Sequence, residues 1–157
     1  MIQIANTSED VEYIIEAHRR IYTDEFQYDF DFVNFIADAI SEFSNNRCEG
    51  MDNIWLLKIE NDPKGSIVIM KYEEGTAQLR WFLIESEYRN MGYGKPMLQR
   101  AIQFCSDAGY KKVFLWTNSS LKAARVLYQS VGFEIVKSRT RKLLNQELIE
   151  EKWELLL

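Results

Sequence analysis

The sequence predicts a mixed α/β fold (α+β in some classifications), with a mostly antiparallel sheet and helices on both of its faces. Three short apolar segments separated by turn residues, within residues 54–85, are typical of an antiparallel meander. Residues 11–43 and 95–131 carry apolar side chains at helical spacing. Between the last two helices, residues 112–116 form an apolar segment that a crossover helix would make parallel to the preceding strand. The expected order is β-α-α-β-β-β-α-β-α-β-β.

The first 45 residues predict one short strand and two helices. Met1–Ala5 alternates apolar and polar residues, and Thr7 or Ser8 can cap the helix that follows, whose first turn is acidic. The only histidine, His18, lies on the apolar face of this helix and is interpreted as a half-buried structural side chain. Apolar residues that recur at spacings of three and four predict the second helix: Phe32, Phe35, Ile36, Ala39, Ile40 and Phe43.

The meander is followed by a helix. Its three strands are predicted at residues 54–60, 65–72 and 76–85. Residues 61–64 and 73–75 contain turn formers and are expected to join these strands. The helix is predicted over residues 95–108, and Gly109 ends it.

The last part of the chain predicts strand, helix and hairpin. After the strand at residues 112–116, Asn118 or Ser119 can cap a helix that ends at Gly132. The inner face of this helix is expected to carry Leu121, Ala124, Leu127, Tyr128 and Val131. Residues 133–139 and 150–157 are expected to form a closing hairpin.

Length and composition are those of one soluble globular domain that spans residues 1–157. No apolar run approaches the ~20 residues of a membrane span, and a signal-peptide pattern is absent. Cys48 and Cys105 lack the spacing of a metal or redox site, which favours a cytoplasmic protein that uses no metal. The net charge of −5, without a long basic stripe, argues against nucleic-acid binding and suits a cationic partner such as an amine.

Residues 89–95, Arg-Asn-Met-Gly-Tyr-Gly-Lys, form a turn between an apolar strand and a helix. Free amide N–H groups and the positive end of the helix dipole converge in such a turn, which suits a phosphate or pyrophosphate. Arg89 and Lys95 add positive charge. The pattern matches neither GxxxxGK[ST] nor GxGxxG, because Pro96 and Met97 stand at the deciding positions. On spacing alone, an ordinary strand-to-helix loop is the alternative.

Residues 22–29, between the first two helices, are acidic and aromatic. One interpretation is a polar connection whose aromatic side chains turn toward the core. The other interpretation is a wall of a substrate pocket that attracts a cation, with Glu25 and Tyr28 as its candidate residues.

The order of elements and two local patterns together resemble the GNAT superfamily of acyl-CoA-dependent N-acyltransferases. The family pattern Gln/Arg-x-x-Gly-x-Gly/Ala is met by Arg89, Gly92 and Gly94, after a strand and before a helix. A later family pattern is met by residues 123–133, Ala-Ala-x-x-Leu-Tyr-x-x-x-Gly-Phe. The resemblance covers the whole chain and implies the GNAT fold.

A narrower resemblance concerns residues 115–124 and the Tyr-Thr-Asp-Glu-Phe segment that begins at Tyr22. Both look like parts of the acetyltransferase domains that are often fused behind MarR-type DNA-binding domains. No DNA-binding module occurs in this sequence, so no role on DNA is expected.

The resemblance implies a role for each matching residue. Backbone amides of the strand before the turn would bind the pantetheine arm of acetyl-CoA and stabilise an oxyanion, at Phe82, Leu83 and Ile84. Tyr128 would be the general acid that protonates the departing CoA thiolate, although a plain core tyrosine is the alternative. Amides that would hold the pyrophosphate belong to Arg89, Asn90, Met91, Gly92, Tyr93, Gly94 and Lys95.

The sequence departs from the family at positions that matter for catalysis. Leu121 stands where many members carry an asparagine that binds the cofactor arm. Gln78 and Trp116 stand where two groups of members carry a glutamate base. Glu85 is the candidate base in this chain, with Glu25 and Glu42 as further carboxylates near element ends. Deprotonation through water, or binding of a neutral amine, is equally open.

The resemblance therefore implies an acetyl-CoA-dependent N-acetyltransferase, in which a primary amine attacks the thioester directly within a ternary complex. One alternative is a non-catalytic acyl-CoA-binding sensor, and another is a phosphate-binding regulatory domain. A small molecule or a protein can supply the amine. The apolar C-terminal strand, residues 153–157, either pairs within the chain or joins a homodimer.

Overall fold

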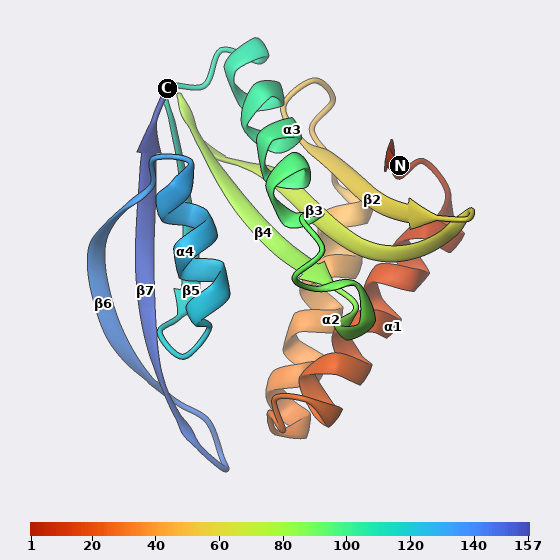
Figure 1. Cartoon of the computed structure of the whole chain (residues 1–157), viewed down its shortest axis with the longest axis vertical. Helices are drawn as coiled ribbons and strands as arrows, with labels where there is room; N and C mark the ends of the chain where they lie inside the picture. Colours follow the sequence, from red (N-terminus) through yellow and green to blue (C-terminus); the bar gives the residue numbers. More distant parts are fainter.

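In the computed structural model, which describes residues 1–157, seven strands form one sheet in the order β1-β2-β3-β4-β5-β7-β6 (Figure 1). Helices cover both faces, and the order of elements is the expected one, so the predicted fold class is confirmed. The strands are β1 (Ile2–Ile4), β2 (Asn53–Ile59), β3 (Asp62–Glu73), β4 (Thr76–Ile84), β5 (Lys112–Asn118), β6 (Glu134–Lys142) and β7 (Glu147–Leu156). The helices are α1 (Ser8–Asp24), α2 (Phe30–Asn45), α3 (Gly94–Asp107) and α4 (Lys122–Ser130), with a 3₁₀ turn η1 (Ser86–Tyr88).

Helices α1 and α2 pack side by side on the face of the sheet that lies behind in Figure 1. Thr7 caps α1 and forms a reciprocal capping box with Asp10, while Asp29 caps α2 by accepting a hydrogen bond from the N–H of Phe32. The buried side chains of α1 and α2 pack on those of β2, β3 and β4, such as Ile54, Val68 and Trp81. These helices therefore form one layer of the molecule.

The turn between β2 and β3 differs from the expected one. Lys58 pairs with Pro63 and Ile59 with Asp62, so only Glu60 and Asn61 remain in the turn. Both have positive φ, 52° and 69°, as a tight hairpin turn of the I′ type requires. Pro63 is tolerated within β3 because the ladder is irregular at this point, between Leu57 and Lys58.

Strand β4 pairs with β5 in parallel over only three residues, Thr76–Gln78 with Lys112–Phe114. Beyond that point β4 continues along β3, and β5 continues along β7, so the two strands diverge (Figure 1). The parallel crossover through α3 was expected from the sequence, and the structure confirms it. The divergence opens the sheet at its centre.

Helices α3 and α4 lie on the front face in Figure 1 and bury the largest core cluster. The core cluster includes Met97, Ala101 and Cys105 of α3, and Tyr128 of α4. The predicted cap of α4 is wrong, because α4 begins after Leu121 without a side-chain cap. Asn118 instead accepts hydrogen bonds from the N–H and hydroxyl of Ser120, in a turn at the end of β5.

The last two strands form a hairpin whose tip contacts the connection between α1 and α2. β7 pairs with β5 on one side and with β6 on the other, so its edges are satisfied within the chain. At the tip, Leu144 N–H donates to Asp29, and the side chains of Asn145 and Gln146 donate to the carbonyl of Gln27. The hairpin thereby bridges the two halves of the opened sheet. None of the helices combines the length and the apolar character that crossing a membrane requires.

Candidate active site

A bulge in β4 shapes the strand where it parts from β5. Ser66 of β3 lies opposite Leu83, but Val68 lies opposite Arg80, so β4 carries one extra residue. Trp81 at this bulge has a φ of +47°, which is a strained conformation for a bulky side chain. Its carbonyl accepts a 2.8 Å hydrogen bond from the Ser66 hydroxyl, which holds the bulge. Such strain is found where a site needs a special backbone course.

Below the bulge, β4 presents free backbone donors toward the gap. Glu85 N–H donates to the carbonyl of Lys64 on β3. Donors alternate in an antiparallel ladder, so the N–H of Leu83 also faces β3, whereas those of Phe82 and Ile84 face the open side. Of the three backbone amides that the sequence analysis expected to bind a ligand, those of Phe82 and Ile84 are free to do so.

The turn before α3 gathers amide groups at one place. The N–H groups of residues 90–95 have no acceptor within the chain. Asn90 and Gly92 have positive φ, 61° and 84°, which curls the backbone so that successive amides converge. A Cβ on Gly94 would lie 3.1 Å from Leu127 Cδ2, so a larger residue here would press on the Leu127 side chain of α4. These groups favour an anion at the start of α3.

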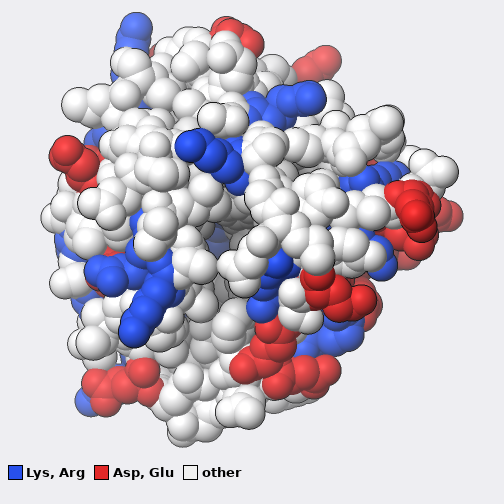
Figure 2. Space-filling model, in the orientation of Figure 1, with Lys and Arg blue, Asp and Glu red and all other residues white.

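A cavity of about 370 Å³ lies between this turn and α4, and we call it the turn cavity. Figure 2 shows a hollow on this face of the molecule, with Lys and Arg side chains near its rim. Leu83 and Met91 do not line the turn cavity; Leu83 packs toward α1, and Met91 is exposed. The lining includes eight residues expected from the sequence: Phe82, Ile84, Arg89, Asn90, Gly92, Tyr93, Gly94 and Lys95. The rest of the lining consists of Tyr88 and four residues of α4: Ala123, Ala124, Leu127 and Tyr128.

The two cations of the turn differ in their surroundings. Arg89 donates through Nε to the carbonyl of Ile84 and through both terminal nitrogens to Glu25, at 2.6 and 3.1 Å. Lys95 lines the turn cavity, and no carboxylate lies within 4.0 Å of it. Lys95 is therefore the cation of the turn whose charge is free to meet an anion.

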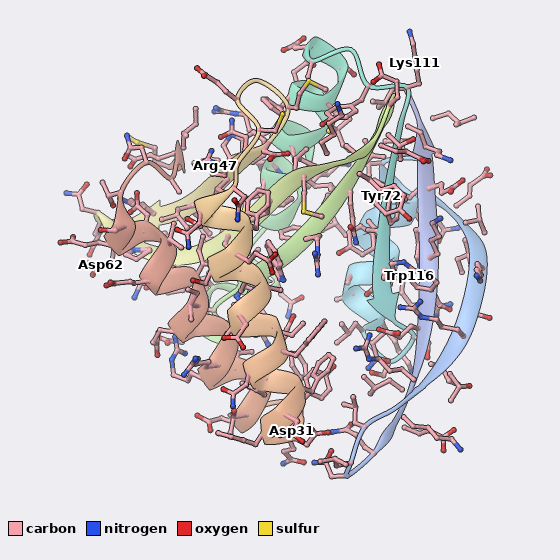
Figure 3. The ribbon with its side chains drawn as sticks, turned by 180° about the vertical axis from the view of Figure 1, so that it is seen from behind. Asp31, Arg47, Asp62, Tyr72, Lys111 and Trp116 are labelled. Carbon is pink, nitrogen blue, oxygen red and sulfur yellow. The ribbon has the colours of Figure 1, made fainter.

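A second cavity, of about 290 Å³, lies where β4 and β5 have parted, and we call it the arginine cavity. Its walls come from the α1–α2 layer, the open edges of β4 and β5, α4 and the closing hairpin. Trp116 lies on the part of β5 that has left β4 (Figure 3). Phe82, Ala124 and Tyr128 line both cavities, so the two meet at these three residues.

Tyr128 lies at this meeting point. Its ring packs against Phe133 and Trp153, with centroids 5.9 and 6.2 Å away, and lies near Phe82. The hydroxyl of Tyr128 makes no hydrogen bond within the chain. Burial raises the pKa of Tyr128 above its usual value, with a smaller contribution from Tyr22, so the hydroxyl holds its proton at neutral pH. Tyr128 is therefore protonated and cannot act as a base, although the raised pKa also makes it a weaker acid than a free tyrosine.

Besides Leu83 and Met91, the two predicted carboxylates also lie outside both cavities. Glu85 lines neither cavity; its carboxylate accepts hydrogen bonds from Arg20 at 2.7 and 3.0 Å and from the Tyr13 hydroxyl at 3.0 Å. Glu25 also lines neither cavity and is bound by Arg89. Tyr28, in contrast, lines the arginine cavity, as expected of a pocket residue.

Sequence reasoning missed the arginines. Arg80, Arg139 and Arg141 line the second cavity, together with Glu150 as its only carboxylate. No local pattern marks these residues, because β4 supplies one arginine, β6 supplies two and only the folded sheet brings them together. No group of three or more His, Cys, Asp or Glu side chains is placed to hold a metal ion.

Comparisons with known proteins agree with this geometry. The family model described as "Acetyltransferase (GNAT) family" matches residues 12–133. Human N-acetyltransferase 8 is 31% identical over an alignment of 85 positions that covers 51% of this chain and 37% of that protein. The match therefore spans well under half of that relative's length.

Solved structures match along the whole chain. An acetyltransferase of the GNAT family from Staphylococcus aureus has a TM-score of 0.80 at 21% identity, with 100% of this chain and 99% of that chain covered. A putative acetyltransferase from Salmonella typhimurium, solved with its cofactor acetyl-CoA, has a TM-score of 0.80 at 13% identity, with 100% and 93% covered. Identities this low show a shared fold only. The narrower likeness to MarR-fused domains is tested by none of these matches and stays a prediction.

Proposed function

The chain belongs to the GNAT family of acetyltransferases, and on this premise we propose that it transfers the acetyl group of acetyl-CoA to a primary amine. One observation carries the proposal. A cavity lined by free amides and a cavity open to a second ligand meet at a protonated tyrosine, Tyr128. Two substrates bound on the two sides would meet there, as a ternary complex requires. We assign the activity to residues 1–157 as one unit.

The turn cavity fits acetyl-CoA. The free N–H groups of residues 90–95 and the side chain of Lys95 would hold its pyrophosphate. The free N–H groups of Phe82 and Ile84 would bind the pantetheine arm along the open edge of β4. Bound there, acetyl-CoA supplies an activated acyl group as a thioester.

The reaction needs one proton donor and one place for a proton to go. The amine nitrogen forms a C–N bond with the acetyl carbon, the C–S bond breaks, and the Tyr128 hydroxyl gives its proton to the sulfur. An N–H of β4 that faces the gap would stabilise the developing oxyanion. The only carboxylate that lines either cavity, Glu150, is bound by Arg139. We therefore assign both protons that the amine loses to solvent, one before binding and one through a water molecule as the C–N bond forms, and the Tyr128 oxygen regains its proton from solvent.

An acyl-enzyme route has no support in this chain. Cys105 is fully buried, and burial raises the pKa of its thiol to about 12. Cys48 is exposed and lines neither cavity. Neither thiol is placed to attack a thioester held in the turn cavity.

The proposal is tested by the release of CoA from acetyl-CoA in the presence of primary amines. Tyr128→Phe keeps the packed ring and removes the proton donor, so we expect kcat to fall on the order of 10²-fold while the Kd for acetyl-CoA stays unchanged. Tyr110→Phe is the matched control, because Tyr110 is equally buried but donates its hydroxyl to the carbonyl of Met51, away from both cavities. Tyr110→Phe should lower the stability of the protein and leave kcat unchanged.

The outcomes separate the candidate functions. Binding of acetyl-CoA without CoA release by any amine would favour the non-catalytic sensor and overturn the proposed transfer. CoA release that is equal in wild type and Tyr128→Phe would keep the transfer and remove Tyr128 from the mechanism.

A further inference from the structure

The arginine cavity is positively charged, although the protein as a whole is acidic. Three arginines and one glutamate line it, and the tyrosines that line it are neutral, so its formal charge is +2. The whole chain carries a net charge of −5. The cavity is therefore opposite in charge to the protein as a whole, and it should favour a negatively charged ligand.

The single glutamate neutralises part of this charge. Glu150 accepts a hydrogen bond from Arg139 Nε at 3.0 Å, and Arg141 lies 3.8 Å from the same oxygen. Arg80 has no carboxylate within 4.0 Å and no hydrogen-bond partner within the chain. The guanidinium of Arg80 is therefore the unpaired cation of the cavity.

Aromatic rings hold the three guanidinium groups in place. Arg80 lies over Trp81 at 4.3 Å from the ring centroid, and Arg139 lies over Trp116 at 3.9 Å. Arg141 lies 5.0 Å from the ring of Phe32. A stacked guanidinium keeps its N–H edge free, and that edge matches the two oxygens of a carboxylate or phosphate.

The bulge in β4 explains why Trp81 lies beside Arg80 on the same side of the strand. Neighbouring side chains of a regular strand face opposite sides, but the extra residue at the bulge puts Arg80 and Trp81 on the same side. Both therefore lie toward the α1–α2 layer, where Tyr22 is close to Arg80. Burial lowers the pKa of the Arg80 guanidinium, which reflects the cost of holding an unpaired cation there.

The acidic residues that were expected to attract a cation do not reach this cavity. Glu25 is bound by Arg89, and Asp29 caps α2 and accepts a hydrogen bond from Leu144 N–H. From residues 22–29, only Tyr22 and Tyr28 line the cavity. The chemistry of the pocket is thus the reverse of the expected one.

We propose that the acceptor is a small amine that also carries an oxyanion group, a carboxylate or a phosphate, which Arg80 binds with help from Arg139 and Arg141. This inference rests on the proposed function, because it places the acceptor in the arginine cavity. The amine then lies toward Tyr128, where this cavity meets the turn cavity. The aromatic side chains that line the cavity would pack against the rest of the acceptor.

The test compares acceptors that differ in the anion, with kcat/KM expressed per neutral amine because the anion also raises the pKa of the amine beside it. Leucine, phenylalanine and aspartate are each paired with their carboxamide derivatives, and phosphoethanolamine is paired with ethanolamine. Wild type should prefer the anionic member of a pair by about 10- to 100-fold in kcat/KM, as expected for hydrogen bonds to a charged group. The pair with the larger preference identifies the oxyanion as carboxylate or phosphate.

Variants assign the preference to the arginines. Arg80→Gln should reduce the preference to within about threefold, mainly by lowering kcat/KM for the anionic member, and Arg80→Lys should keep part of it. Arg141→Gln is a second variant that should also reduce the preference. The ion pair of Arg141 with Glu150 is long, and the loss of this pair leaves Glu150 bound to Arg139. Arg100→Gln is the matched control, since it removes one arginine from the exposed side of α3 and should leave the preference unchanged.

A binding measurement separates this inference from the proposed function. Calorimetry with N-acetylleucine and N-acetylleucinamide, in the presence of CoA, needs no turnover. If no amine releases CoA but the anionic product binds at least tenfold tighter in wild type than in Arg80→Gln, the transfer fails and the anion site stands. Turnover of neutral amines with no preference for an anion would overturn the inference and leave the proposed transfer intact. Equal binding of the two products, or binding of neither, would also overturn the inference.

Discussion

The guanidinium of Arg89 donates two hydrogen bonds to the carboxylate of Glu25, 64 residues away in the sequence. Its Nε also donates to the carbonyl of Ile84, so one side chain joins the end of α1, the end of β4 and the turn that follows. The sequence marked both residues as ligand contacts, one for an anion and one for a cation. In the structure these two charges bind each other instead.

We therefore expect Arg89 to contribute more to the fold than to ligand affinity. Each side chain of the pair is 33% exposed, so a double-mutant cycle of Arg89→Gln and Glu25→Gln should give a coupling of roughly 0.2–1 kcal/mol in urea unfolding. The Kd for acetyl-CoA should change by less than about threefold in Arg89→Gln. A tenfold loss of affinity without coupling to Glu25 would show that the guanidinium leaves its partner to bind phosphate.

The glycine at the centre of the turn offers a sharper test of the phosphate site. Gly92→Glu puts a carboxylate beside the free amides, and we expect the affinity for acetyl-CoA to fall at least about tenfold, or about 1.4 kcal/mol. Gly109→Glu is a matched control at the other end of α3. Both glycines have similar positive φ, 84° and 88°, and an added Cβ meets nothing within 4 Å at either place.

Because the backbone cost is shared, only the position of the charge differs between the two variants. Calorimetric titration with acetyl-CoA measures the affinities, and thermal unfolding without ligand checks that both variants lose similar stability. Equal affinities in the two variants would mean that the turn does not hold the pyrophosphate.

Glu85 is expected to act on stability and not on proton transfer. Hydrogen bonds from Arg20, and then from Tyr13, hold the pKa of this carboxyl below its usual value despite burial. A carboxyl with a lowered folded-state pKa contributes stability that is present above its unfolded pKa and is lost as the pH falls through the folded one. Glu85→Gln should therefore cost roughly 1–3 kcal/mol at neutral pH and less in acid.

The kinetic half of this prediction concerns the pH profile. Since Glu85 lines neither cavity, the variant should keep the pH dependence of kcat/KM of wild type. Steady-state rates between pH 6 and pH 9 check this. A large fall in kcat at every pH in this range, in a variant that is folded, would return Glu85 to the role of base.

Local patterns predicted the parts of the site that are local in the chain. The spacing of Gly92 and Gly94 between a strand and a helix is enough to predict a turn with free amides, and the structure has it. The family resemblance implied a role for Tyr128 through its spacing to Gly132 and Phe133, and this tyrosine lies where the two cavities meet. Which charges remain free is a tertiary property, so the pairing of Arg89 with Glu25 left no trace in the sequence.

The arginine cavity could not be predicted for the same reason. Its cations come from strands β4 and β6, which are separated in the sheet by β5 and β7. The bulge puts Trp81 on the same side as Arg80, where its ring lies under the guanidinium, and a bulge shifts the alternation on which strand predictions rest. The turn at Glu60 and Asn61 was misplaced because Pro63 and Asp62 are usual turn residues, whereas positive φ at Glu60 has no sequence signal.

The environment of His18 predicts how the free energy of unfolding depends on pH. The sequence suggested a half-buried side chain, but His18 is 1% exposed; its Nδ1 donates to the carbonyl of Ile14 at 2.7 Å, and its Nε2 has no partner. Burial lowers the pKa of this imidazole to about 4, against 6.5 for an unperturbed one. Between these values the unfolded chain binds a proton that the folded chain does not, so stability is full above pH 6.5 and falls as the pH drops toward 4.

From these two pKa values, the free energy of unfolding should fall by about 2 kcal/mol between pH 7 and pH 5 through His18 alone. His18→Phe keeps an aromatic ring beside Tyr22 and removes the titrating group, so its stability should be nearly independent of pH over this interval. Urea unfolding of both proteins at pH 5, 6 and 7 measures the difference. Parallel losses in the two proteins would show that the imidazole takes up its proton in the folded state as readily as in the unfolded one, through water reaching Nε2.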